Sequence, residues 1–143
     1  ALRKALPLLG EAFFVLYGDS WLDVDYTAVY QAFKESKLPA LMTVFRNEGH
    51  WDNSNVELQA GQIQLYSKVQ RNERMGHIDY GLGILTRELL ETYPEQQTSD
   101  LAEVYERLSR EQRLASYEAT QRFYEIGSPR GLEELNLKLR DEV

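Results

Sequence analysis

The most constraining feature of the sequence is a short apolar run that ends at a Gly-Asp-Ser turn. Residues 12–17 (AFFVLY) are apolar without interruption, and Gly18-Asp19-Ser20 follow directly. An unbroken run of this length predicts a strand that is buried on both faces, as at the centre of an α/β sheet. Ligands of such sheets bind beyond the carboxyl ends of the strands, where Asp19 is placed to hold a metal ion or a phosphate. Taken alone, Gly-Asp-Ser is more simply interpreted as an ordinary turn.

Helix and strand signals alternate after this run. Apolar positions at helical spacing predict a helix over Tyr26–Ser36 with Asp25 as its N-cap, and a second apolar strand follows over residues 40–45. Strand, helix and strand in this order predict a βαβ unit with a parallel pair of strands. The later pattern predicts, in order, a hairpin at Ala60-Gly61, a strand over 75–85, helices over 86–92 and 101–112, strands over 114–120 and 122–126, and a helix over 130–141. We expect one α/β domain over residues 1–143.

Two later stretches have the composition of a ligand site. Residues 46–55 (RNEGHWDNSN) form a polar loop beyond the carboxyl end of the second predicted strand, where a loop can contribute to a site. Gly81 and Gly83 lie inside the predicted strand 75–85. Glycines at such positions indicate a bulge, or a place where a ligand approaches the backbone closely.

Composition excludes several classes of function. The net charge of −7 argues against a nucleic-acid partner, because phosphate backbones are bound by basic surfaces. No apolar run approaches the ~18 residues that a membrane span needs, and no signal-peptide pattern opens the sequence. The sequence has no cysteine and only two histidines, which makes thiolate or histidine-rich metal sites improbable. We therefore expect a cytoplasmic protein with neither a nucleic-acid nor a membrane partner.

Five segments resemble the sugar-1-phosphate nucleotidylyltransferase family. They occur in the order that the family has: YGDS (17–20), YSK (66–68), IDYGL (78–82), SDLAEVY (99–105) and RFYEIGSPRGLEE (122–134). The similarity is greatest to the branch that acts on hexose- or heptose-1-phosphates. The resemblance implies the nucleotide-diphospho-sugar transferase fold, a three-layer α/β/α sandwich around a mixed, mostly parallel sheet.

The resemblance implies a magnesium site. Asp19 matches the family's metal-binding aspartate, which ends a strand in a Gly-Asp motif. Glu125 matches the second metal-binding carboxylate, which in the family is usually an aspartate. Glutamate is longer by one methylene, so the position of the ion, or a water between the ion and the protein, is expected to differ. Mg²⁺ binds one or two protein carboxylates together with substrate phosphates, which suits this pair.

The resemblance also implies contacts to the sugar phosphate. Lys68 matches the lysine of a Glu-Lys pair that binds the sugar phosphate, whereas the acidic member of the pair is replaced by Ser67. Asp79 and Gly81 match the family's sugar-binding turn approximately. In the implied reaction a sugar-phosphate oxygen attacks the α-phosphorus of a nucleoside triphosphate, and pyrophosphate leaves. Positioning and charge neutralisation dominate such a reaction, so Asp19 and Lys68 are the candidate catalytic residues.

One family motif is not found in the sequence. The glycine-rich G-x-G-T-R loop, which holds the triphosphate and the base, has no counterpart, and no GxxxxGK loop replaces it. Residues 1–4 resemble the helix that follows a later Gly-Thr-Gly-Gly segment of the family. We therefore expect the sequence to begin about halfway into the catalytic domain, with the sugar and metal half of the site. An apolar sheet edge or face would then be exposed, which favours homo-oligomers.

Two alternatives stay open at this level. Asp23-Val24-Asp25 spells the D-x-D of metal-dependent glycosyltransferases with a related fold, although Asp25 also suits the N-cap of a helix. The missing nucleotide loop favours a different class, a non-catalytic domain that binds a sugar phosphate or a partner chain. A G-x-G-T-R loop upstream in the reading frame would favour the enzyme.

Overall fold

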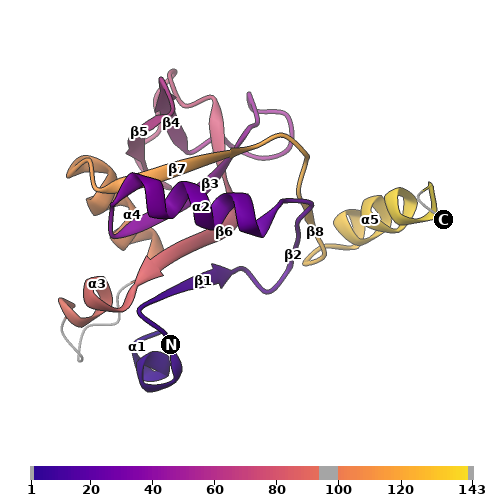
Figure 1. The fold of residues 1–143 in the computed structure, drawn as a ribbon. Coiled ribbons are helices and arrows are strands. Elements are labelled where there is room, and N and C mark those ends of the chain that lie inside the picture. The colour runs from indigo at the N-terminus through magenta and orange to yellow at the C-terminus, as the bar shows by residue number, and fades with distance from the viewer. Residues whose placement is uncertain (1, 94–99, 142–143) are drawn as a thin grey trace.

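The computed structural model describes residues 2–93 and 100–141 and contains a six-stranded mixed sheet and a two-stranded ribbon (Figure 1). In chain order the elements are α1 (Leu2–Ala5), η1 (Leu6–Leu8), β1 (Ala12–Leu16), β2 (Ser20–Trp21), α2 (Tyr26–Ser36), β3 (Ala40–Arg46), β4 (Val56–Gln59), β5 (Gln62–Tyr66), β6 (His77–Thr86), α3 (Arg87–Glu91), α4 (Leu101–Arg110), β7 (Leu114–Ala119), β8 (Tyr124–Glu125) and α5 (Pro129–Asp141). No helix in the described ranges is long and apolar enough to cross a membrane.

Strand β6 is the centre of the sheet. The strand order is β5-β4-β6-β3-β7, and β1 also pairs with β6. Strand β3 pairs with one edge of β6. On the other edge, β4 pairs with β6 at His77, and β1 pairs with it along Leu82–Thr86. The β3–β6 register shifts between Met42 and Val44, which places a bulge at the Gly81 region, as its glycines indicated.

Helices cover both faces of the sheet, as the three-layer prediction requires. Leu41 of β3 packs with Val29 and Phe33 of α2 on one face. Its neighbour Met42 points to the opposite face and lies in a cluster with Tyr105 and Leu108 of α4. Adjacent strand residues face opposite ways, so one apolar strand supplies two cores. Helix α5 extends away from this body at the C-terminal end (Figure 1).

Local sequence signals are confirmed at several elements. The side chain of Asp25 accepts hydrogen bonds from the amides of Thr27 and Ala28, so it caps α2 as predicted. Ala60 and Gly61 both have positive φ, which a two-residue hairpin turn between β4 and β5 requires. Asp100 caps α4, whereas Ser99 of the SDLAEVY segment lies outside the described residues.

Two predictions about the sheet are wrong. Its class is mixed, as expected, but in the described part only β3 and β7 pair in parallel, and the other pairings are antiparallel. Strands β1 and β3 run in the same direction but are separated by β6, so the expected adjacent parallel pair does not form. Nor is β1 buried on both faces. It pairs only with β6 among the described residues, and Phe14 and Leu16 are 40% and 49% exposed.

The exposed side of β1 continues onto α2. The ring of Phe14 packs edge-on against Tyr26 and lies beside Tyr30, and both tyrosines are themselves exposed. An apolar surface is therefore exposed at β1, where the sequence predicted a buried strand. Self-association through it stays a prediction.

A substitution in β6 tests how tightly the sheet packs on α4. A Cβ at Gly83 would overlap the Tyr105 hydroxyl and lie 3.0 Å from the Leu41 carbonyl oxygen. We expect Gly83→Ala to lower the free energy of unfolding by about 1–3 kcal/mol, as overpacking does. Gly76→Ala is the control, since a Cβ there meets nothing within 4 Å. Equal losses in urea denaturation of the two variants would contradict this packing.

Candidate functional site

The five residues that the sequence singled out line one cavity. It has a volume of about 220 Å³ and lies where β1 and β5 end and β4 and β6 begin, near the β2–β8 ribbon. Its walls include the predicted metal ligands, the lysine and the sugar-binding turn: Asp19, Glu125, Lys68, Asp79 and Gly81. These residues come from segments up to about a hundred positions apart in the sequence. The fold therefore brings the predicted set together, while the role of each residue stays a prediction.

The β2–β8 ribbon places Asp19 beside Glu125. Ser20 lies opposite Glu125 in this antiparallel pair, and the Ile126 amide donates to the Asp19 carbonyl oxygen at 2.8 Å. A Cβ at Gly127 would lie 3.1 Å from Oδ2 of Asp19, so the Asp19 carboxylate packs against that glycine. The two carboxylates thus approach each other because a short ladder fixes their backbones.

A third carboxylate, Asp52, joins the pair from the loop after β3. The buried side chain of Asn47 donates to the carbonyl oxygen of Asp52 at 2.6 Å and to the Ser54 hydroxyl at 3.2 Å, which fixes the loop. Burial raises the pKa of Glu125, and the negative charges of Asp19 and Asp52 raise it further. The charges of Asp19 and Asp52 therefore repel that of Glu125, and a bound cation would offset this repulsion.

This donor set fits Mg²⁺ rather than a metal held by protein alone. No group of three or more His, Cys, Asp or Glu side chains arranged to hold a metal is found in residues 2–93 and 100–141. Asp19 and Glu125 offer hard carboxylate oxygens, and Mg²⁺ commonly takes one or two of these while keeping waters and substrate phosphates. The structure is thus compatible with the predicted magnesium site.

Asp79 lines the cavity and also forms hydrogen bonds with other residues of the protein. Its Oδ2 accepts from the Tyr17 hydroxyl at 2.7 Å, and its Oδ1 accepts from the Gly81 amide at 3.0 Å. Its own amide donates to Oδ1 of Asn55 at 3.0 Å. Burial raises the pKa of Asp79, while the bonds from Tyr17 and Gly81 and the charge of Lys68 lower it. Each carboxylate oxygen has a second lone pair, so a sugar hydroxyl can still be bound.

Ser67 is buried, whereas its neighbour Lys68 is exposed. The Ser67 hydroxyl donates to Glu106 at 2.9 Å and accepts from the amides of Val69 and Gln70, so Ser67 shapes the turn after β5. Lys68 is exposed at the cavity. A lysine there supplies a mobile point charge suited to a phosphate.

The D-x-D alternative finds no support in the geometry. Asp25 is occupied as the cap of α2, and the Asp23 carbonyl oxygen accepts a long bond from the Tyr80 hydroxyl at 3.4 Å. Neither aspartate lines the cavity that holds Asp19 and Glu125.

Sequence reasoning did not select several residues of the cavity wall, among them Tyr17, Asp52 and Asn55. Tyr17 was assigned to the apolar run, and Asp52 and Asn55 were part of a loop expected to contribute to a site without any residue being chosen. The available signal was the position of that loop after β3. Asn55 is placed by hydrogen bonds to distant residues, which the sequence pattern does not reveal, whereas Asp52 is held by Asn47 within the loop.

The fold is shared with solved structures of nucleotidyltransferases. No protein-family model matches the chain, and no curated protein does. A Bacillus anthracis protein assigned as a glucose-1-phosphate thymidylyltransferase superposes with a TM-score of 0.83 at 14% identity over 98% of this chain. The inositol-1-phosphate CTP transferase of T. maritima gives 0.73 at 20% over 96%, and the UDP-glucose pyrophosphorylase of Acinetobacter baumannii gives 0.73 at 19% over 94%.

These similarities establish the fold that the resemblance implied. The chain has the fold of the sugar-1-phosphate nucleotidyltransferases, and the resemblance is confirmed at that level. The chain spans only part of each of these proteins, 59%, 58% and 53% of their lengths respectively. The shared part carries the cavity with Asp19 and Glu125.

The carboxylate cluster generates a pH prediction. Because its pKa is raised, Glu125 binds its proton more tightly in the folded state, so its contribution to stability falls as the pH rises through that pKa. Asp19→Asn removes one of the repelling charges. We expect the pKa of Glu125 in this variant to move down toward its ordinary value, as measured by NMR titration of the side-chain carboxyl. Asp25→Asn is the control, since asparagine also caps helices. An unchanged Glu125 pKa in Asp19→Asn would contradict the pairing.

Proposed function

We propose that this chain is the sugar- and metal-binding part of a Mg²⁺-dependent sugar-1-phosphate nucleotidylyltransferase. The observation that carries the proposal is the cavity in which Asp19, Glu125, Lys68, Asp79 and Gly81 converge within the shared fold. Its reaction joins a sugar-1-phosphate to the nucleoside monophosphate part of a nucleoside triphosphate. The sugar-phosphate oxygen forms a bond to the α-phosphorus, and pyrophosphate leaves with the electron pair of the broken bond.

Each residue has a role in this proposal. Asp19 and Glu125 would hold Mg²⁺, which when bound supplies positive charge to the phosphate oxygens. Lys68 binds the sugar phosphate and offsets its charge in the attacking position. Asp79 and Gly81 orient the sugar ring through a carboxylate acceptor and a stretch of backbone without a side chain. Tyr17 holds Asp79 in place through its 2.7 Å hydrogen bond.

The names of the solved neighbours agree with these substrates. One structure is described as UTP-bound, one as complexed with UDP-glucose, and one, HddC from Yersinia pseudotuberculosis, as complexed with GMP-PN. We extend the same classes of partner to this chain, a nucleoside triphosphate and a sugar-1-phosphate. The cytoplasm, where nucleoside triphosphates are abundant, is the compartment that this function implies.

A second candidate is a domain that binds a sugar phosphate without turnover. It is favoured by one observation, that the cavity combines carboxylates suited to Mg²⁺ with a lysine suited to a phosphate, which is sufficient for binding alone. The carboxylates and Lys68 would then bind Mg²⁺ and a sugar phosphate as a complex. Catalysis would require further residues or would not occur.

The two candidates are separated by a pyrophosphate-release assay. The assay uses the chain as printed and, in parallel, the chain extended by residues that precede it in its reading frame, with Mg²⁺, the common nucleoside triphosphates and pooled sugar-1-phosphates. We expect release by the extended form and a loss of about 100-fold or more in Asp19→Asn, because metal-ion catalysis contributes several kcal/mol. Asp25→Asn, outside the cavity, serves as the matched control.

Calorimetric titration with the same sugar phosphates completes the design. Mg²⁺-dependent binding without pyrophosphate release from either form would favour the non-catalytic domain. Neither binding nor release would contradict the assignment of the cavity as a sugar-phosphate site.

A further inference from the structure

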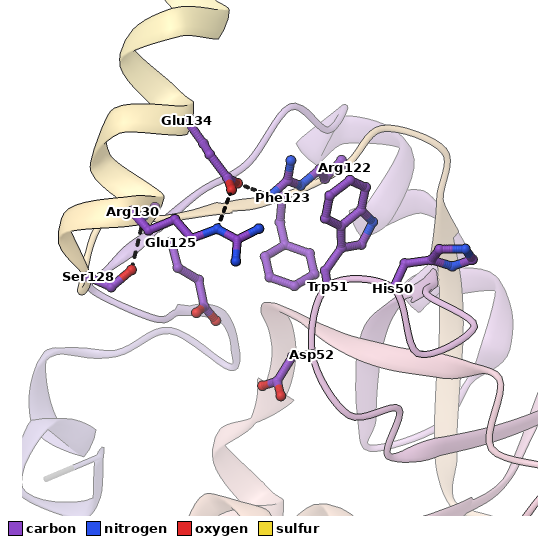
Figure 2. A pocket seen from close by; sticks show the side chains of 10 residues that line it. His50, Trp51, Asp52, Arg122, Phe123, Glu125, Ser128, Arg130 and Glu134 are labelled. Carbon is purple, nitrogen blue, oxygen red and sulfur yellow. Dashed lines mark hydrogen bonds and ion pairs between the residues drawn. The ribbon is translucent and has the colours of Figure 1, made fainter.

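A second cavity lies against the first and shares its carboxylate wall. It has a volume of about 200 Å³, and Figure 2 shows its lining residues. Three of them, Asp52, Phe123 and Glu125, also line the first cavity. The rest of its lining comes from the loop after β3, the segment between β7 and β8, and the start of α5. Trp51, Arg122 and Glu134, one from each of these segments, form the connection between them.

Arg122 is the centre of this connection. Its guanidinium lies over the Trp51 ring, with 3.6 Å to the ring centroid, and over the Tyr124 ring at 4.6 Å. Its Nη2 donates to Oε2 of Glu134, whose Oε1 accepts from Nε of Arg130 at 2.9 Å. The Nε of Arg122 is buried and has no hydrogen-bond partner among the described residues. Aromatic contacts as well as the Glu134 pair therefore hold the guanidinium.

The two aromatic contacts of Arg122 are the sequence neighbours of two site carboxylates. Trp51 precedes Asp52, and Tyr124 precedes Glu125. The spacing between the loop after β3 and strand β8 is therefore set by one planar group that packs on both rings. Helix α5 is tied to the same guanidinium through Glu134, which lies on that helix. The helix also contacts β8 directly, because Gly131 approaches the Glu125 carbonyl too closely to carry a Cβ. A single side chain thus joins the three segments around the carboxylates.

We propose that Arg122 is a positioning residue, which packs the Asp52 loop against strand β8 so that the charge of Asp52 stays near the Asp19–Glu125 pair. This inference rests on the proposed function in taking Asp19 and Glu125 as the cation ligands. Asp52 is not one of these ligands; it lines the same cavity and increases the negative charge that the cation meets. Arginine suits this task because its planar guanidinium stacks on aromatic rings, which the compact ammonium of lysine does not do in the same way.

The test compares Arg122→Lys with Arg113→Lys in the full chain. Arg113 forms an ion pair with Glu111 on the surface, where the two side chains are 48% and 40% exposed. It lines neither cavity. Mg²⁺ affinity is measured by calorimetry, and Mn²⁺ is used as a paramagnetic probe of the Asp52 amide signal in NMR spectra. We expect Arg122→Lys to weaken Mg²⁺ binding about tenfold, because the charge of Asp52 is then no longer held near the cation, and to reduce the Mn²⁺ broadening at Asp52. Arg113→Lys should change neither quantity.

Variants of Trp51 separate positioning from folding. Trp51→Phe keeps a ring for the guanidinium and should retain most of the Mg²⁺ affinity, whereas Trp51→Ala should match Arg122→Lys. A lower unfolding midpoint in Arg122→Lys with unchanged Mg²⁺ affinity and unchanged broadening at Asp52 would overturn the inference and leave the proposed function intact. If the unaltered chain binds neither Mg²⁺ nor Mn²⁺, the metal site of the proposed function fails, and this inference fails with it.

Discussion

The hydrogen bonds at the bulge of β6 determine the geometry of the site. The Asp79 carboxylate accepts from both the Tyr17 hydroxyl and the Gly81 amide, and the Tyr17 amide in turn donates to the Gly81 carbonyl oxygen at 2.9 Å. These bonds fix the point at which the chain leaves β1, and Asp19 follows two residues later. Since Asn55 binds the Asp79 amide, the start of β4 is tied to the same bulge. A buried carboxylate with satisfied partners specifies one arrangement of several strands.

The sequence predicts much of the secondary structure and the candidate residues, because these depend on local rules. Helix α2 begins and ends as its apolar spacing and its Asp25 cap predict, and the Ala60-Gly61 turn follows from the positive φ that such hairpins need. Asp19 was a candidate from its position after an apolar strand, and the family resemblance favoured it over an ordinary turn. Glu125, Lys68, Asp79 and Gly81 were chosen by resemblance to a family, and their convergence in one cavity agrees with that choice. Their individual roles stay predictions.

The rest of the structure depends on contacts between distant segments. An apolar run gives no sign of which neighbours its strand has, so the exposure of Phe14 and the position of β6 between β1 and β3 could not be foreseen. The contact of Arg122 with Trp51 joins residues about seventy positions apart, and each residue alone has an ordinary surface interpretation. Loop closure over such distances leaves no periodic pattern in the sequence.

The single pairing of β1 has a consequence for the protection of its backbone from solvent. In an antiparallel ladder only alternate amides of an edge strand bond to the neighbour, and in the described structure β6 is the sole neighbour of β1. Deuterium should therefore enter β1 at every second amide, while β3, paired on both sides, exchanges slowly along its length. A chain segment or second molecule that added a strand to β1 would slow the fast amides and leave the slow ones as they were. The isotope pattern of this one strand would thus report whether anything is bound at its free edge.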